Sequence, residues 1–276
     1  MRASRLFGIR TSQESKNMAP DHLPLSRNGL PVIHGEGRLE IFVRKLLSHS
    51  LLSTEVQNAM AELPYSLRRL EPGEYIFREG DCAQICPILL SGYAFRHKIS
   101  KSGGRQIVAL KIPGDPLDFQ SLYLKTADHN LQTLTVAELA IVSLSDLENL
   151  VVNRPPLARA VLVDILIEAS IGREWLLNIG RRDALARLAH FLCELHVRLR
   201  QMASPGLDES DIPLTQEQLA DLLGLTPVHI NRTLRSLEAS GAVRRTGRRL
   251  RVADIEQLYT IAGFSDLYLH RDNSLP

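Results

Sequence analysis

The chain has 276 residues, of which 44% are hydrophobic and 23% are charged. This length accommodates two domains and a connecting element, and the composition is that of a globular protein with an adequate core. The formal net charge of only +2 argues against a uniformly basic, histone-like binder, so any basic surface must be local. Three cysteines without regular spacing predict no disulfide framework, which fits a reducing cytoplasm.

Residues 1–37 are rich in Ser, Pro, Gly, Asn and charge and show little periodicity, so we expect a disordered tail. Translation can begin at Met1 or at Met18, and the sequence leaves both open. Arg10 interrupts the short apolar run near the N-terminus, and no stretch resembles a transmembrane span. We therefore expect a cytoplasmic protein without membrane contacts.

Residues 38–152 are expected to form a β-rich domain behind two helices. Apolar residues recur at helical spacing over residues 39–47 and 54–63. Between residues 67 and 144, short strand-like segments alternate with Gly, Pro and Asp, a pattern typical of a small antiparallel barrel or sandwich. A closing helical turn is expected over residues 146–152.

Pro155 and Pro156 end one element and begin a long helix that runs to about Ile179. Small and apolar residues recur along it at alternating spacings of four and three, the heptad pattern of a two-helix coiled coil. We predict that residues 153–180 form a dimerisation helix with this heptad seam: Ala158, Leu162, Ile165, Ala169, Gly172, Leu176 and Ile179. A single amphipathic helix lying on its own barrel is the alternative, and a second apolar row would allow both roles.

Residues 181–276 are expected to form a DNA-binding domain, beginning after a hinge at Gly180. An amphipathic helix is predicted over residues 183–200, followed by a polar loop over residues 203–211. Near the end of the chain, Asp254 can cap a final helix that runs to about residue 262. The last residues are expected to fray.

Between these helices lies a stretch with strong capping signals. Thr215 followed by Gln218 is a capping box, and Gly224 is suited to end a helix in the left-handed conformation. Thr226 can cap a second helix, with Pro227 at its first position. Two short helices joined by a tight glycine turn predict a helix-turn-helix. An ordinary helical hairpin with a solvated basic face is the alternative.

The second of these helices divides into two faces. Ile230, Leu234 and Leu237 share the inner face. The outer face is basic and polar, and Arg and Asn are the side chains that read guanine and adenine edges bidentately. The expected base or groove contacts are His229, Asn231, Arg232 and Arg235, with Val228 placed to touch a thymine methyl group. The end amides and hydroxyls of Thr215, Gln216 and Thr226 are expected to meet phosphates.

An arginine-rich hairpin follows Gly241. Strands are predicted over residues 242–245 and 249–252, with a turn at Thr246-Gly247. A basic β-wing beside a recognition helix suits phosphate contacts that position a protein on DNA. The wing candidates for these backbone contacts are Arg244, Arg245, Arg248 and Arg249.

The order of barrel, long helix and winged helix-turn-helix resembles the Crp/Fnr superfamily of bacterial transcription regulators over roughly residues 38–262. Its further landmarks are Pro72-Gly73, Gly80-Asp81, Leu90 with Gly92, Gly104 and Gly114-Asp115. The resemblance implies an α+β fold with a cyclic-nucleotide-binding-like antiparallel β-roll, a long dimerisation helix and a winged helix-turn-helix. It also implies a homodimer that binds a pseudo-palindrome in double-stranded DNA, with RNA polymerase as a further partner.

Two departures from the family pattern affect the expected ligands. Pro227 and Val228 stand where many members carry Arg or Ser followed by Glu, while the following arginine is kept as Arg232. The loss of this glutamate puts the family's usual half-site in doubt, because it would accept from a cytosine amino group. The nucleotide-contact segments of the family align with residues 118–120 and 127–129, which lack both the ribose-binding glutamate and the phosphate-binding arginine. We therefore predict an effector domain that is degenerate for cyclic nucleotide.

Other cofactors are weakly supported. The family's oxygen-sensing iron–sulfur cluster uses four cysteines, mostly in an N-terminal run, and Cys82, Cys86 and Cys193 are too few. Cys82 and Cys86 can bind a metal with His97 or His129, and either histidine can be a haem ligand, but buried thiols are the simpler interpretation. We therefore expect no cofactor and no metal.

Two further functional classes were weighed against DNA binding. The chain has no Gly-rich phosphate loop, nucleophile elbow or HExxH motif, so no enzyme activity is expected. The remaining alternative is a signalling dimer, responsive to a cyclic nucleotide or another ligand, whose main role is not DNA binding.

Overall fold

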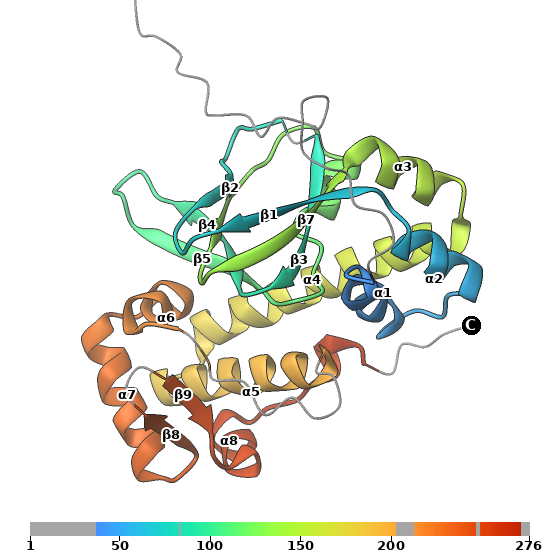
Figure 1. Cartoon of the computed structure of the whole chain (residues 1–276). Coiled ribbons are helices and arrows are strands. Elements are labelled where there is room, and N and C mark those ends of the chain that lie inside the picture. The colour runs from blue at the N-terminus through green and yellow to red at the C-terminus, as the bar shows by residue number, and fades with distance from the viewer. Residues whose placement is uncertain (1–36, 83, 203–211, 213, 247–248, 272–276) are drawn as a thin grey trace, which may run out of the picture.

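The computed structural model describes residues 37–82, 84–202, 212, 214–246 and 249–271. It shows a β-roll, a long helix beneath it and a C-terminal head, in that chain order (Figure 1). The predicted disordered tail lies outside the described residues except for Gly37, as does the predicted loop at 203–211. None of the described helices combines the length and the apolar character needed to cross a membrane.

The β-roll consists of two antiparallel sheets behind two short helices, α1 (Glu40–Leu47) and α2 (Thr54–Ala61). One sheet has the order β1-β7-β3, with β1 (Tyr65–Leu70), β7 (Ala137–Ser143) and β3 (Ile85–Ser91). The other has the order β2-β6-β4-β5, with β2 (Tyr75–Phe77), β6 (Asn130–Thr133), β4 (Ala94–Ile99) and β5 (Arg105–Lys111). The predicted short antiparallel strands and the α+β fold class are confirmed.

Gly92 shows how the sequence allows the roll to close. It lies between β3 and β4 with φ of +79°, and a Cβ there would lie only 2.2 Å from the carbonyl oxygen of Val136. Glycine alone combines this conformation with so close a backbone approach. The side chains that fill the roll are mostly aliphatic, and Leu89, Leu131 and Leu139 are fully buried among them.

Two predictions about the following helices were wrong in detail. The closing turn is a nine-residue helix, α3 (Leu144–Val152), because Leu147 and Val151 pack on the roll. The expected hinge at Gly180 is absent, since α4 (Pro155–Arg181) continues through it and the chain leaves the helix at Arg182. A glycine in a helix interior costs about 1 kcal/mol relative to alanine, and the buried side chains of the last turns offset this cost.

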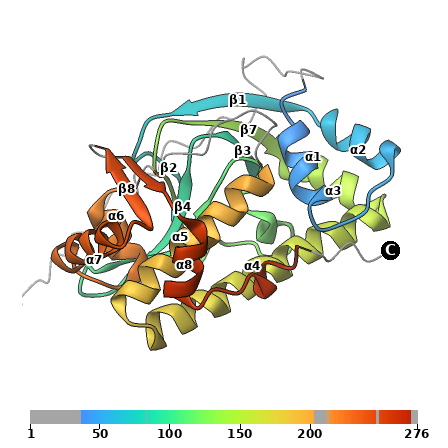
Figure 2. The same cartoon turned by 90° about the horizontal axis from the view of Figure 1, so that it is seen from below.

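The C-terminal head begins with α5 (Ala184–Met202), which runs beside α4 beneath the roll (Figures 1 and 2). The roll also contains η1 (Phe119–Leu122), between β5 and β6. The head continues with α6 (Gln216–Leu223), α7 (Pro227–Ala239), β8 (Val243–Thr246), β9 (Arg249–Val252), α8 (Ile255–Ala262) and η2 (Leu267–Leu269). Leu188 and Leu192 of α5 belong to the same hydrophobic core as Phe95 and Leu110 of the roll. The core therefore continues from the roll into the head.

The expectation that the last residues fray is not met over residues 263–271, and residues 272–276 lie outside the described residues. Residues after α8 fold back onto the molecule, where Leu269 is 6% exposed and Tyr268 is half-buried. This segment forms η2 and contacts α4.

Candidate nucleic-acid interface and effector cavity

The predicted helix-turn-helix is formed by the capping interactions that the sequence indicates. The amide of Gln218 donates to Thr215 Oγ1 at 3.2 Å, and Gln218 Oε1 accepts from the amide of Thr215 at 2.8 Å. Gly224 ends α6 with φ of +63°. Thr226 Oγ1 then accepts from the amide of His229 at 3.2 Å, with Pro227 at the first position of α7.

The two faces of α7 divide as its periodicity predicts. Ile230, Leu234 and Leu237 are at most 3% exposed. Val228 is 81% exposed, and Arg232 and Arg235 are exposed as well, while His229 and Asn231 are half-buried on the flanks. At the start of α6, Thr215 is exposed and Gln216 half-buried; Thr226 before α7 is exposed. The predicted reading face is therefore accessible, and base contacts from it remain a prediction.

The predicted wing exists, with its first strand beginning one residue later than expected, at Val243. Arg244 is exposed, whereas Arg245 forms an ion pair with Glu238 of α7 and is half-buried. This pair raises the pKa of Arg245 and ties the wing to the recognition helix. Arg248 lies outside the described residues, and of Arg249 only the backbone, at the start of β9, is described.

The predicted heptad seam lies largely on the open side of α4. Leu162 is 53% exposed and Leu176 is 74% exposed; Ala169 and Gly172 are exposed, and Ala158, Ile165 and Ile179 are half-buried. The opposite side of α4 packs on its own chain through Val161 and Ile167, among others. The helix therefore lies on its own roll and also presents an uncovered apolar row.

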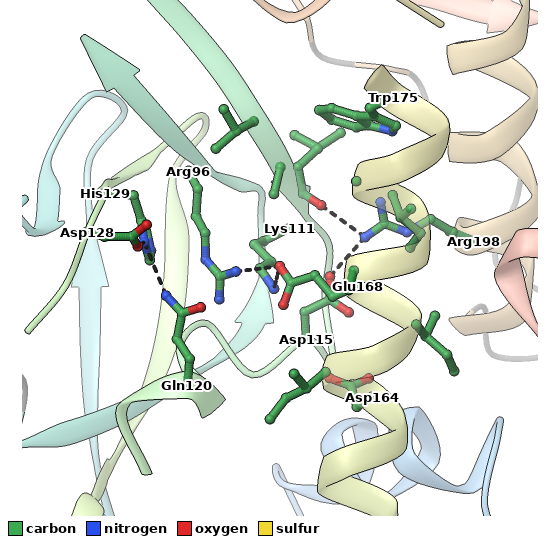
Figure 3. A pocket seen from close by; sticks show the side chains of 18 of the residues that line it. Arg96, Lys111, Asp115, Gln120, Asp128, His129, Asp164, Glu168, Trp175 and Arg198 are labelled. Carbon is green, nitrogen blue, oxygen red and sulfur yellow. Dashed lines mark hydrogen bonds and ion pairs between the residues drawn. The ribbon is translucent and has the colours of Figure 1, made fainter. Parts of the chain in front are cut away.

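A cavity of about 450 Å³ lies where the roll meets α4 (Figure 3). Its apolar wall includes Val108 and Trp175, and Ile165, Ala169 and Gly172 of the seam reach it as well. Its charged lining comes from α1, β4, β5, α4, α5 and the loops of the roll: Lys45, Arg96, Lys98, Lys111, Asp115, Asp128, Asp164, Glu168 and Arg198. Cations and anions are thus almost equal in number around it.

Two buried cations of the roll share one carboxylate of α4. Arg96 Nη1 and Lys111 Nζ lie 2.5 and 2.8 Å from Glu168 Oε1, and Arg96 Nη2 also donates to the carbonyl oxygen of Leu117 at 2.7 Å. Burial alone would raise the pKa of Glu168, but the two cations lower it to about 2. Burial lowers the pKa of Lys111. Arg96 and Lys111 therefore share one internal counter-charge, which a bound anion would have to displace or match.

A second group of ion pairs surrounds Asp115 and Asp164. Lys45 Nζ lies 3.3 Å from Asp115 and 3.5 Å from Asp164. Arg198 Nη2 lies 3.1 Å from Asp115, and His49 Nε2 lies 3.2 Å from Asp164. Burial would raise the pKa of Asp164, but Lys45 and His49 hold it well below its usual range. These pairs join α1, α4 and α5 to the turn after β5.

The segments aligned with the family's nucleotide contacts do not fit a cyclic nucleotide. Phe119 is 3% exposed and packs edge-on against Phe42, while Ala127 is 4% exposed. Asp128, beside His129, would repel the cyclic phosphate. Gln120 Nε2 lies 3.2 Å from His129 Nδ1, and Asp128 Oδ1 lies 2.8 Å from the same nitrogen.

Of the residues considered for metal and haem, only His129 lines this cavity. Cys86 and Cys193 are fully buried, and burial raises both thiol pKa values to about 12; Cys82 is exposed. His97 packs between Phe95 and Tyr75, and burial lowers its pKa to about 4. Within the described ranges, no three His, Cys, Asp or Glu side chains group as metal ligands.

Sequence reasoning missed the cavity residues Arg96, Lys111 and Glu168. One local signal was available, since Asp164 and Glu168 lie four positions apart within an otherwise apolar helix, a spacing that places both on one face. The partners of Glu168 belong to strands more than fifty positions away, and those of Asp164 lie in or just after α1. Nothing local identifies either set.

Comparison with known proteins agrees with this architecture. The cyclic nucleotide-binding domain family matches residues 67–154, and the Crp-like helix-turn-helix domain family matches residues 186–261. The nitrogen fixation regulation protein FixK of Bradyrhizobium diazoefficiens is 30% identical over 174 residues, covering 62% of this chain and 71% of that protein. The transcriptional activator protein FnrL of Cereibacter sphaeroides is 27% identical over 200 residues, covering 71% of this chain and 80% of that protein.

The solved structure of FixK2 from Bradyrhizobium japonicum shares the fold. It covers 73% of this chain and 98% of its own, with 24% sequence identity and a TM-score of 0.65. A nucleotide-binding-type roll joined by a long helix to a Crp-like helix-turn-helix defines a class of transcription regulators. The chain belongs to the Crp/Fnr family of DNA-binding transcription regulators.

Cyclic nucleotides should not bind the cavity at micromolar concentrations. Phe119 and Ala127 stand at the expected contact positions, and Glu168 already pairs with Arg96 and Lys111. Isothermal titration calorimetry with cyclic AMP and cyclic GMP should therefore give no binding heat. Stoichiometric micromolar binding that strengthens DNA binding would contradict this prediction.

Protonation of Glu168 at low pH should weaken the contact between the roll and α4 and so lower the stability of the protein. The pKa of Glu168 is about 2 in the folded chain and ordinarily 4.5, so its contribution to stability is complete above about pH 4.5 and is lost as the pH falls towards 2. Glu168→Gln should be less stable at neutral pH and should lose less stability across this window than the wild type. Urea denaturation at several pH values tests this, with exposed Glu148→Gln as the control. Equal acid dependence in the wild type and Glu168→Gln would contradict it.

Proposed function

We propose that this regulator binds a pseudo-palindromic operator as a homodimer in which two α4 helices pack along their seams. The heptad spacing fits a second copy of the same helix. Leu162 and Leu176 expose large apolar surfaces in the single chain, and a contiguous exposed apolar surface commonly marks an interface. A two-fold dimer would present its recognition helices to half-sites about one helical turn, ~34 Å, apart.

The proposed contacts to DNA rest on one observation, the division of α7 into a buried apolar face and an exposed basic face. Arg232 and Arg235, with His229 and Asn231 on the flanks, would reach base edges in the major groove, and Val228 would touch a thymine methyl group. Thr215, Gln216 and Thr226 would meet phosphates, as would the wing arginines Arg244, Arg245, Arg248 and Arg249. The ion pair of Arg245 with Glu238 makes Arg244 the stronger described wing candidate.

The remaining aspects of the proposal follow from family membership and from the cavity. We infer that the protein acts in the cytoplasm, contacts RNA polymerase at its promoters and has no enzymatic activity. Because Glu168 already pairs with Arg96 and Lys111 inside the cavity, we also infer that DNA binding does not require a cyclic nucleotide.

Breaking the seam should produce monomers that bind the operator poorly. Leu162→Glu places a charge in the proposed interface, and Leu162 is 53% exposed, so the monomer fold should tolerate it. Val152→Glu is a matched control, because Val152 is 70% exposed on α3, outside the seam. Sedimentation at micromolar concentration should show dimers for the wild type and the control only. A wild-type monomer that binds palindromic DNA tightly would exclude the dimer.

Two arginines should separate base reading from phosphate binding. Arg232→Ala should weaken specific sites selectively, by about 1–3 kcal/mol of discrimination per bidentate contact, and relax the preference at one base pair per half-site. Arg244→Ala should weaken all sequences alike and reduce the salt slope by about one unit per lost contact in each subunit. Titrations of specific and scrambled duplexes at several salt concentrations measure both effects.

The comparison of the two duplexes decides the placement of α7. Equal loss on specific and scrambled DNA for Arg232→Ala would show that Arg232 contacts only the backbone. No loss on either duplex would show that α7 is not the reading helix.

A further inference from the structure

The last described segment crosses from the head to the long helix. Gly263 ends α8 with φ of +56°, and the amide of Phe264 donates to the carbonyl oxygen of Tyr259 at 3.0 Å. From there the chain runs back beside α4 and α5 (Figure 2) and forms η2 against α4. This segment lies beyond residue 261, where the match to the helix-turn-helix family ends.

Aromatic packing and one hydrogen bond hold this segment in place. The ring of Tyr268 stacks on His190 of α5 at 5.7 Å, and the ring of Phe264 lies 5.0 Å from His190 and 6.3 Å from Tyr268. Burial lowers the pKa of His190 to about 3, so its ring is neutral and packs as an aromatic. The Tyr268 hydroxyl donates to Glu194 Oε2 at 2.9 Å, and Leu269 is buried beside it.

Glu194 is the point where the parts of the protein meet. This carboxylate is 1% exposed, and Oε2 also accepts from Trp175 Nε1 of α4 at 2.9 Å. Arg198 lies 3.3 Å from Oε1 and extends to Asp115 and the carbonyl oxygen of Leu110 in the roll. One buried carboxylate therefore joins the long helix, the head, the C-terminal segment and, through Arg198, the roll.

We propose that residues 264–269 form a C-terminal strap that fixes the DNA-binding head on α4 and sets the spacing between the two heads of the dimer. The inference rests on the proposed function, because a fixed spacing matters only where two heads bind one duplex. Without the strap, Glu194 loses the hydrogen bond from Tyr268 and α4 loses its contacts with η2, so the head is held less rigidly relative to the dimer axis. Rigid heads favour one half-site spacing, whereas mobile heads tolerate several, since the linker geometry sets the effective concentration of the second head.

The test measures spacing preference in full-length protein. An operator is selected from a randomised duplex pool with the wild type, and binding is then measured on this duplex and on versions with base pairs inserted between the half-sites. Tyr268→Ala removes the ring and the hydroxyl, and Tyr268→Phe removes the hydroxyl alone. Leu267→Ala is the matched control, because Leu267 is 81% exposed on the same turn. Trp175, the only tryptophan of the chain, reports on Glu194 by its fluorescence.

The wild type and Leu267→Ala should strongly prefer the selected spacing. Tyr268→Ala should lose about tenfold of this preference, and Tyr268→Phe should lose part of it. The Trp175 emission should change in both Tyr268 variants. If Tyr268→Phe and Tyr268→Ala retain the wild-type preference, whether or not the emission changes, the strap does not set the spacing. A wild type that selects no two-half-site duplex would instead refute the proposed dimeric function, and the strap proposal with it.

Discussion

Charges buried between the roll, α4 and α5 must find partners, and this requirement determines how the parts of the chain lie against one another. Moving a single ion out of water costs several kcal/mol unless an opposite charge and hydrogen bonds compensate. Arg96 and Lys111 of the roll pair with Glu168 on α4, and Arg198 of α5 pairs with Asp115 in the turn after β5. Apolar burial is non-directional, whereas these pairs form only when the elements dock in one arrangement.

The same pairs make the roll and the head one continuous body. The hydrophobic core passes from Phe95 and Leu110 into α5 without interruption, and Arg198 adds polar contacts along the same path. The domain boundary predicted after residue 180 remains a prediction, and it falls in a region where packing is continuous. A head held in this way is positioned by the helix and by the roll together.

The sequence was most informative where structure depends on neighbouring residues. The helix-turn-helix was predicted correctly because Thr215, Gln218 and Gly224 specify its ends within a few positions. Prediction was wrong where contacts between residues far apart in the sequence determine the conformation against the local residue propensity. Gly180 stays helical because Asn178 beside it donates to the carbonyl oxygen of Arg187 in α5. The cavity was not foreseen because Arg96 and Glu168 are 72 positions apart, and periodicity carries no information about which buried charges meet.

The three partners of Glu194 restrict how this sequence can change over generations. A lone substitution of Arg198 or Tyr268 leaves a buried carboxylate short of a donor, and loss of Glu194 removes the acceptor of Trp175 and Tyr268 and one of the acceptors of Arg198. Each single substitution should lower the free energy of unfolding by more than the same substitution made together with its compensating partner. These positions should therefore change together. Lineages that lose the strap would be expected to replace Glu194 with an apolar residue, and Arg198 with it. The residues around Glu194 should therefore be kept or lost together. Exposed residues of α7 and the wing can change independently of them and alter which operator is bound.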